Sequence, residues 1–169
     1  MPATKTLVLD NTQISQKINR IAYQIYENNF EEEEIIIAGI VDKGYTLAER
    51  IAKVLKEIAP LKIRLVKVTI NKKQPLSEPV QSELSANEIK NKVVIVVDDV
   101  LNSGITLAYG VKYFLDFPVK AIRTVIMVDR SHKNFPIKAD YVGLTLATTL
   151  KEHISVELDN KGNDAVYLT

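Results

Sequence analysis

The stretch that decides the fold is VVIVVDDVLNSGITL, residues 93–107. Its first five residues, 93–97, are apolar and mostly β-branched, which predicts a strand that is covered on both faces of a sheet. Two adjacent carboxylates, Asp98 and Asp99, follow at once, and we expect them in solvent at the exposed end of that strand. A glycine-containing turn then leads into a helix over 106–116. A buried strand, a polar turn and a helix in succession are typical of an α/β sheet.

The rest of the chain alternates expected helices and strands around this unit. Apolar positions recur three and four residues apart over 14–26 and over 47–58, which predicts two amphipathic helices, and Asn11 or Thr12 is placed to cap the first. The other expected strands are short apolar runs at 35–40, 63–70 and 119–128, with small closing strands at 141–146, 154–158 and 165–168. This order predicts an α/β fold in which helices flank both faces of a central, mostly parallel sheet, in a single domain over residues 1–169.

Residues 71–91 interrupt the alternation. The segment NKKQPLSEPVQSELSANEIKN contains two prolines and no sustained apolar period, so no secondary structure is expected there. A structureless stretch of about twenty residues inside a compact domain is usually a functional lid or a disordered segment.

The composition excludes several classes of protein and of site. The chain has 169 residues and no Cys, which excludes a disulfide framework, a thiolate metal site and a cysteine nucleophile. Two His residues are too few for a His-rich zinc site, and 22 Lys+Arg against 21 Asp+Glu is not the balance of a protein that coats nucleic acid. The N-terminus, MPATKTLVLD, lacks an apolar signal core, and no apolar run reaches the length of a membrane span. We therefore expect a cytoplasmic protein with no membrane partner.

Four polar segments converge on one edge of the predicted sheet. In an open α/β sheet, ligands bind beyond the carboxyl ends of the strands. Residues 41–45, 71–91, 98–106 and the pair at 129–130 all follow expected strands at that edge. The sequence therefore predicts the ligand site there.

The turn over 102–106 has the chemistry of a phosphate site. Free amides and the positive end of the helix dipole attract an anion, and Gly104 allows close approach or a positive φ. The hydroxyls of Ser103 and Thr106 can donate to phosphate oxygens. With two carboxylates beside it, the turn suits a sugar phosphate, although an ordinary capped helix with solvated acids is the alternative. Neither GxxxxGK[ST] nor GxGxxG occurs, which excludes a P-loop and a dinucleotide fingerprint.

Residues 93–107 resemble the phosphoribosyl pyrophosphate motif of type I phosphoribosyltransferases. Two further stretches, IIIAGIVDKGYTLAERIA at 35–52 and VDRSHKNFPIKADYVG at 128–143, resemble the family of bifunctional pyrimidine-operon regulators and uracil phosphoribosyltransferases. The likeness covers most of the chain except 71–91. It implies the type I phosphoribosyltransferase fold with a flexible hood over 71–91, and a homo-oligomer. The implied reaction is displacement of pyrophosphate from phosphoribosyl pyrophosphate (PRPP) by a nucleobase, with Mg²⁺ held mainly by the donor's oxygens.

The resemblance also implies roles for individual residues. Asp98 and Asp99 would bind the ribose hydroxyls and stabilise a cationic, oxocarbenium-like sugar. The 5′-phosphate would be held by the turn that contains Asn102, Ser103, Gly104, Ile105 and Thr106. The pyrophosphate loop, in which this family often has a cis peptide bond between non-proline residues, would be Asp42, Lys43 and Gly44.

The resemblance further implies a base pocket and a closing hood. The ring of Tyr141 would stack on the pyrimidine, and the backbone at Val142 would recognise its edge. Arg130 either approaches the pyrophosphate or base, or forms an ion pair with Asp129 or Asp140. The hood would exclude water from the sugar cation. Its two lysines, at 72 and 73, either bring charge to the pyrophosphate or keep an exposed lid soluble.

Three positions depart from the family pattern. Ile105 stands where Arg or another polar residue is common, which removes an electrostatic contribution to phosphate binding. Asn102 stands where purine enzymes tend to have Asp, and an amide cannot accept a proton at neutral pH, so a purine is disfavoured. The hood carries Asn-Lys-Lys-Gln at 71–74 in place of a Tyr-Arg-acidic pattern.

We therefore expect an enzyme that makes UMP and pyrophosphate from uracil and PRPP. One alternative is a nucleotide-sensing, RNA-binding regulator of pyrimidine genes with little turnover, and another is a transferase for a different base, such as a purine. The basic residues available for RNA are scattered and make a weak case: Lys17, Arg20, Lys133, Lys138 and Lys151.

Overall fold

The computed structural model describes residues 4–149, 152–159 and 161–169. Its main sheet has six strands in the order β4-β3-β2-β5-β6-β7. The strands are β2 (Glu34–Ile40), β3 (Lys62–Thr69), β4 (Gln81–Ser82), β5 (Val93–Leu101), β6 (Ala121–Asp129) and β7 (Tyr141–Thr145). All neighbouring pairs are parallel except β3 with β4. The expected mostly parallel sheet is thereby confirmed.

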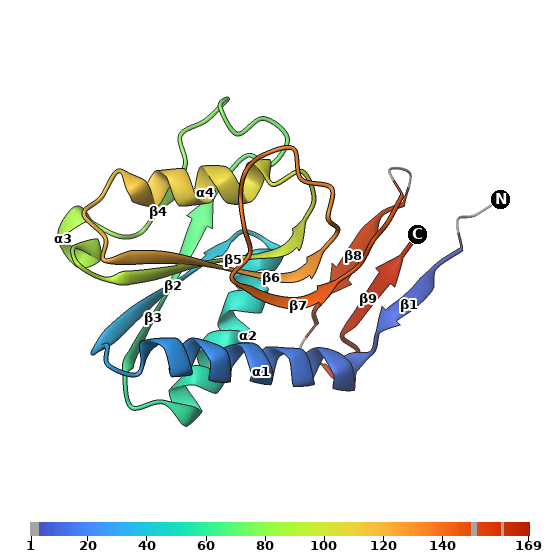
Figure 1. Cartoon of the computed structure of the whole chain (residues 1–169), viewed down its shortest axis with the longest axis horizontal. Coiled ribbons are helices and arrows are strands. Elements are labelled where there is room, and N and C mark those ends of the chain that lie inside the picture. The colour runs from blue at the N-terminus through green and yellow to red at the C-terminus, as the bar shows by residue number, and fades with distance from the viewer. Residues whose placement is uncertain (1–3, 150–151, 160) are drawn as a thin grey trace.

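Helices cover both faces of this sheet. Figure 1 shows α1 (Asn11–Asn29) and α2 (Lys43–Ile58) below the sheet and α4 (Ile105–Leu115) above it. A second, antiparallel sheet lies at the end of the molecule where the N- and C-termini are found, and its strands run in the order β1 (Thr6–Leu9), β9 (Ala165–Leu168) and β8 (Ile154–Glu157). No helix in the described ranges combines the length and the apolar run that crossing a bilayer requires.

The two apolar layers explain the uninterrupted apolar runs of the central strands. Ile35 and Ile37 of β2 belong to the apolar layer between the sheet and the helices α1 and α2. Ile36 and Ala38 belong to the layer on the opposite face, between the sheet and α4, together with Phe114. Successive side chains of a strand point to opposite faces, so a strand covered on both sides must be apolar at every position.

The cap of the first helix differs from expectation. Asp10, rather than Asn11 or Thr12, is the N-cap: its Oδ1 accepts from the Gln13 amide, and Oε1 of Gln13 accepts from the Asp10 amide, each at 2.9 Å. These reciprocal bonds form a capping box. Oδ1 of Asn11 instead accepts from the amide of Asp164, 3.2 Å away, so its side chain ties the helix to the C-terminal hairpin.

The segment 71–91 is more ordered in secondary structure than expected. It contains β4, which pairs with β3, and the short helix α3 (Ala86–Ile89). Leu84 and Ile89 are buried in the layer beneath α4, which anchors the second half of the segment. Residues 71–80, here called the hood loop, lie outside the sheet and pass beside α4 (Figure 1).

Strand β5 extends to Leu101 and does not end before the carboxylates. Its pairing with β6 continues through Asp98 opposite Ile126 and Leu101 opposite Asp129. Asp98 is therefore only 2% exposed and Asp99 only 9%. The expectation that both acids lie in solvent is wrong, because β6 runs beside them to its own end. Strand β1 was not expected, since it is short, half-exposed and paired with β9 from the far end of the chain.

We expect Asp10→Ala to lower the free energy of unfolding by about 1 kcal/mol, because the Gln13 amide at the start of α1 loses its side-chain acceptor. Asp10→Asn keeps an acceptor oxygen at the same place, so its free energy of unfolding should be close to that of the parent protein. Urea titrations of the three proteins measure the difference. Equal losses in both variants would contradict the capping box.

Candidate functional site at the carboxyl edge of the sheet

The carboxyl ends of β2 and β5 bring the expected polar segments together. The cis peptide bond between Val41 and Asp42 follows the end of β2, immediately before α2 begins. Gly44 packs on β5: a Cβ placed there would lie 2.7 Å from the Val97 carbonyl oxygen and 2.9 Å from Oδ1 of Asp98. Only glycine allows this close approach, which sets the exposed Asp42 and Lys43 beside the carboxylates.

The turn before α4 is shaped as an anion site requires. Gly104 is the N-cap of α4 with φ +91°, and a Cβ there would meet Ile137 at 2.5 Å. Oγ of Ser103 accepts from the Ile105 amide at 3.3 Å, and the Ser103 carbonyl accepts from the amide of Asn134 at 2.8 Å. The turn, with Asp98 beside it, lines a cavity of about 40 Å³. Backbone amides at a helix start thus face a small space next to a carboxylate.

A lysine from the hood loop bridges the two carboxylates. Nζ of Lys72 lies 3.0 Å from Oδ1 of Asp98 and 3.7 Å from Oδ1 of Asp99. Oδ1 of Asp98 also accepts from the amide of Asp99 at 2.9 Å. The sequence offered two roles for Lys72, bringing charge to the pyrophosphate or keeping an exposed lid soluble. It did not predict this bridge, because nothing in the sequence pairs a residue after β3 with two residues of β5.

Burial and proximity perturb the protonation of this cluster. Burial first, and then the negative charge of Asp99, raises the pKa of Asp98 to about 7, while Lys72 acts in the opposite direction. Burial would lower the pKa of Lys72, but the two carboxylates outweigh it and raise that pKa above its ordinary value. The lysine therefore stays charged, and Asp98 takes up its proton near neutral pH.

Arg130 fastens the turn over 102–106 and does not form the ion pair that was one of its two expected roles. It is buried, and it donates to Oδ1 of Asn102 at 2.9 Å and to Oγ1 of Thr148 at 3.0 Å. It also donates to the carbonyls at 149 and 152. Among the described residues, no ion pair joins Arg130 to Asp129 or Asp140. Its guanidinium instead holds the side-chain oxygen of Asn102 in one orientation.

Tyr141 lies in the core at the start of β7. It is 4% exposed, and its hydroxyl accepts from Nδ2 of Asn28 on α1 at 2.8 Å. Stacking of this ring on a base, which the resemblance implies, would require the ring to leave its contact with α1. The neighbouring Val142 carbonyl accepts from Arg20 at 2.7 Å, so its backbone is also fastened to α1.

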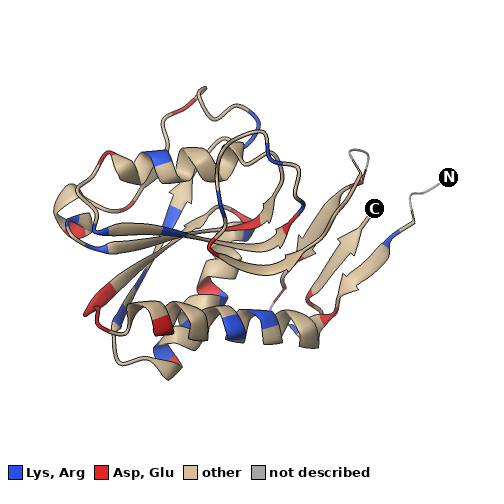
Figure 2. Cartoon of the chain, viewed as in Figure 1, with Lys and Arg blue, Asp and Glu red and all other residues tan. Residues whose placement is uncertain are grey.

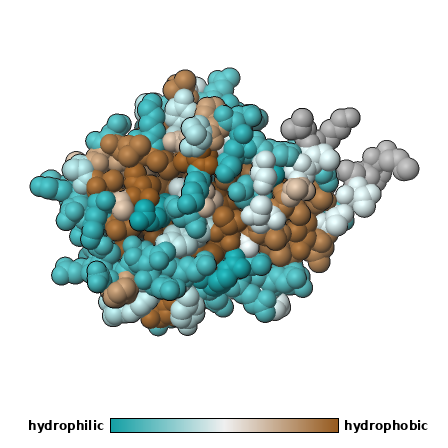
Figure 3. Space-filling model, viewed as in Figure 1, coloured by the Kyte–Doolittle hydropathy of each residue, from teal (hydrophilic) through white to brown (hydrophobic). Residues whose placement is uncertain are grey.

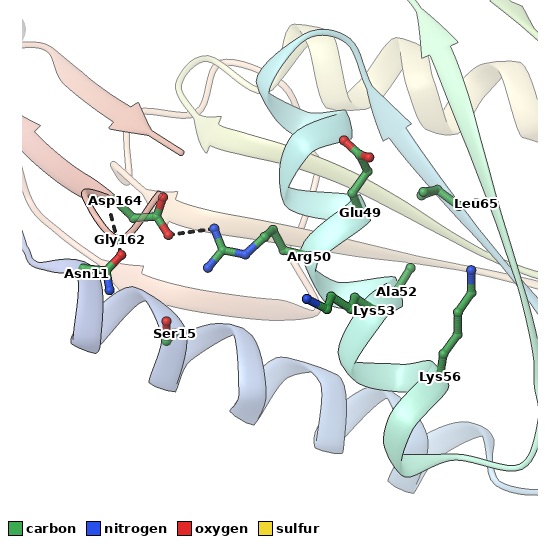
Figure 4. A pocket seen from close by; sticks show the side chains of 10 residues that line it. All are labelled: Asn11, Ser15, Glu49, Arg50, Ala52, Lys53, Lys56, Leu65, Gly162 and Asp164. Carbon is green, nitrogen blue, oxygen red and sulfur yellow. Dashed lines mark hydrogen bonds and ion pairs between the residues drawn. The ribbon is translucent and has the colours of Figure 1, made fainter. Parts of the chain in front are cut away.

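A separate cavity of about 680 Å³ lies along α2, remote from this edge (Figure 4). Arg50 and Lys53 point toward α1, and Arg50 pairs with Asp164 at 2.6 Å. The lining residues of α2 run from Glu49 to Lys56, away from the start of the helix at the carboxyl edge. The cavity shares no lining residue with the phosphate turn and is not part of this site.

Comparison with known proteins identifies the family. The model of the phosphoribosyl transferase domain matches residues 6–161 of the chain. The chain belongs to this family. It is 35% identical to the bifunctional protein PyrR of Clostridium acetobutylicum over 170 residues, which cover 95% of this chain and 93% of that protein. It is 34% identical to the bifunctional protein PyrR of Haemophilus ducreyi over 164 residues, which cover 91% of this chain and 90% of that protein.

Solved phosphoribosyltransferases share the fold. The hypoxanthine phosphoribosyltransferase of Trypanosoma cruzi superposes with a TM-score of 0.76 at 15% identity, covering 96% of this chain and 95% of that one. A hypoxanthine-guanine phosphoribosyltransferase of Bacillus anthracis superposes with a TM-score of 0.72 at 22% identity, covering 88% of this chain and 86% of that one. The expected type I phosphoribosyltransferase fold is thereby confirmed.

The raised pKa of Asp98 should make stability depend on pH. The native carboxyl has a pKa of about 7, against 3.8 in the unfolded chain, so between these values the native state binds more protons. The contribution of Asp98 to the free energy of unfolding therefore falls as the pH rises from about 4 to about 7. Asp98→Asn, which stays neutral, should lack this fall. Urea titrations across that range measure it, and a constant difference between the two proteins would contradict the assignment.

Proposed function

We propose that the chain is a single phosphoribosyltransferase domain that transfers phosphoribose from PRPP to uracil, giving UMP and pyrophosphate. The observation that carries this proposal is the placement of the buried carboxylate of Asp98, followed by the buried Asp99, at the small cavity that the turn over 102–106 lines. This pairing of acceptors and donors matches a sugar with free hydroxyls and a 5′-phosphate.

Each part of the donor has a place in the proposal. Its 5′-phosphate accepts from the amides and hydroxyls of the turn that starts α4, and its ribose hydroxyls donate to Asp98 and Asp99. Its pyrophosphate lies against the backbone at Asp42, Lys43 and Gly44. The carboxylates in a largely buried site stabilise the positive charge that develops on the sugar as pyrophosphate departs.

Mg²⁺ enters the proposal with the donor. The described ranges contain no group of three or more His, Cys, Asp or Glu placed to hold a metal ion. In the proposal, the ligands of Mg²⁺ are mostly the diphosphate oxygens of the donor and water, which is how this ion usually binds. When bound, the ion neutralises charge on the leaving group.

Two observations favour a pyrimidine. The relatives at about 35% identity are named as bifunctional PyrR proteins. Asn102, held by Arg130, offers an amide where a proton acceptor for a purine would be needed. Val142 remains a backbone contact for the base in this proposal, and the ring of Tyr141 does not take part.

The second candidate is a nucleotide-sensing regulator that binds RNA, favoured by the same relatives. Figure 2 shows Lys and Arg scattered over the elements without a continuous basic stripe, and Lys151 lies outside the described residues.

We also propose that the protein is cytoplasmic and assembles as a homo-oligomer. A groove of about 480 Å³ between α4 and β6 is lined by Leu115, Val119 and Ile122, and Figure 3 shows apolar side chains gathered between α4 and the strands below it. Covering such a groove with a second copy of the chain would bury apolar area.

The first test measures pyrophosphate release from PRPP with Mg²⁺ and, separately, uracil, hypoxanthine, guanine, adenine and orotate. We expect release with uracil. Release with a purine only would contradict the substrate, and no release with any base while PRPP still binds would favour the regulator. Failure to bind PRPP would contradict both.

We expect the double variant Asp98→Asn, Asp99→Asn to lose pyrophosphate release by at least about a hundredfold, because the sugar cation loses its electrostatic partners. Asparagine has the shape of aspartate, so the variant should keep the circular dichroism spectrum of the parent. Ordinary turnover by the folded variant would contradict the ribose assignment.

A further inference from the structure

The hood loop follows β3 and reaches the carboxylates of β5, although β3 and β5 are not neighbours in the sheet. β2 separates β3 from β5 in the sheet, so Lys72, three residues after β3 ends, crosses the end of β2 to approach Asp98 and Asp99. The Lys72 side chain is 39% exposed, whereas the Asp98 side chain is only 4% exposed. The cation therefore enters from the solvent side and covers the acids.

A local turn fixes the backbone that carries this lysine. Ile70 is buried just before the loop, and Oδ1 of Asn71 accepts from the amides of Lys73 and Gln74 at 3.1 and 3.0 Å. An Asn side chain that bonds to the following amides holds a turn. The turn directs residue 72 toward β5, so the ion pair is a built feature of the loop.

In the proposed function, the carboxylates that Lys72 contacts also accept from the ribose hydroxyls. Oδ1 of Asp98 accepts from both Nζ of Lys72 and the Asp99 amide, and Oδ1 of Asp99 also faces Nζ. A carboxylate oxygen accepts about two hydrogen bonds, so Oδ1 of Asp98 has no room for another donor. A bound ribose and the bridging lysine therefore exclude one another at this atom.

We propose that Lys72 is a built-in counter-ion of Asp98 and Asp99, which competes with the ribose hydroxyls for these carboxylates and leaves when the donor binds. This inference rests on the proposed function. Its consequence is that donor binding frees the start of the hood loop, so entry of the sugar and movement of the loop are coupled.

The structure leaves space for that movement. A cavity of about 440 Å³ separates residues 74–77 of the loop from Ile105 and Tyr109 at the start of α4. Leu76 in this loop is 79% exposed, so movement of the loop exposes little more of its apolar surface. The apolar Ile105, unusual for the phosphate turn, then faces the loop across this space.

The binding test uses ribose 5-phosphate, which has the hydroxyls and the phosphate of the donor but no pyrophosphate for a lysine to contact. We expect Lys72→Met to bind it about fivefold more tightly than the parent at about pH 8.5, since no cation has to be displaced. Lys72→Arg should restore parental affinity. Lys53→Met, on α2 and remote from the site, makes the same change in charge and should bind as the parent does.

The pH profile separates competition from a general structural effect. The charged groups that face Asp98 are Asp99 on the same strand and Lys72 from the hood loop, while Gly44 of α2 packs on it without charge. Without the lysine the pKa of Asp98 rises further, and a proton takes the place of the ammonium. The advantage of Lys72→Met should therefore shrink toward about pH 6. Equal or weaker binding by the variant at about pH 8.5 would overturn the proposal.

Hydrogen exchange of the ligand-free protein tests whether the ion pair of Lys72 with Asp98 and Asp99 holds the hood loop, here called the tether. This test does not depend on the proposed function. We expect amides of the hood loop to exchange about fivefold faster in Lys72→Met than in the parent or in Lys53→Met. Unchanged exchange would overturn the tether even if PRPP binds. A different result separates this inference from the proposed function. If hydrogen exchange shows the tether but neither the parent nor any variant binds ribose 5-phosphate or PRPP, the proposed function fails and the ion pair has another role.

Discussion

The fold buries two adjacent carboxylates, Asp98 and Asp99, at the end of its central strand, and the site is arranged around their charge. Burial first, and then the neighbouring charge of Asp99, raises the pKa of Asp98 to about 7. The chain itself supplies one cation, from Lys72. In the proposed reaction, the ribose hydroxyls and the positive charge that develops on the sugar compensate the same two carboxylates.

The walls around the carboxylates are held by backbone contacts and by one buried arginine. Gly44 lets α2 approach β5, and Gly104 starts α4 with a positive φ against Ile137. Arg130 ties Asn102 to the segment after β7. Loops that carry functional groups need such fixed supports, because a site gains from groups that are already oriented before the ligand arrives.

The sequence predicted the parallel sheet and the site edge because both depend on local patterns. Apolar runs mark buried strands, and the Asn-Ser-Gly turn after 93–101 marks a helix start. The burial of Asp98 could not be predicted, since it depends on how far β6 runs beside β5. The contacts of Arg130 and the core position of Tyr141 likewise depend on partners that are distant in sequence. The capping box at Asp10 depends on a local bond that competes with the expected cap. The Lys72 bridge needs the strand order β3-β2-β5, which no local pattern contains.

A crystal structure of the protein with ribose 5-phosphate tests the central claim most directly. The account predicts the phosphate on the amides of residues 103–106, the ribose hydroxyls within hydrogen-bonding distance of Asp98 and Asp99, and Nζ of Lys72 displaced from both carboxylates. A sugar phosphate bound elsewhere, such as in the cavity along α2, with the lysine bridge intact, would contradict it.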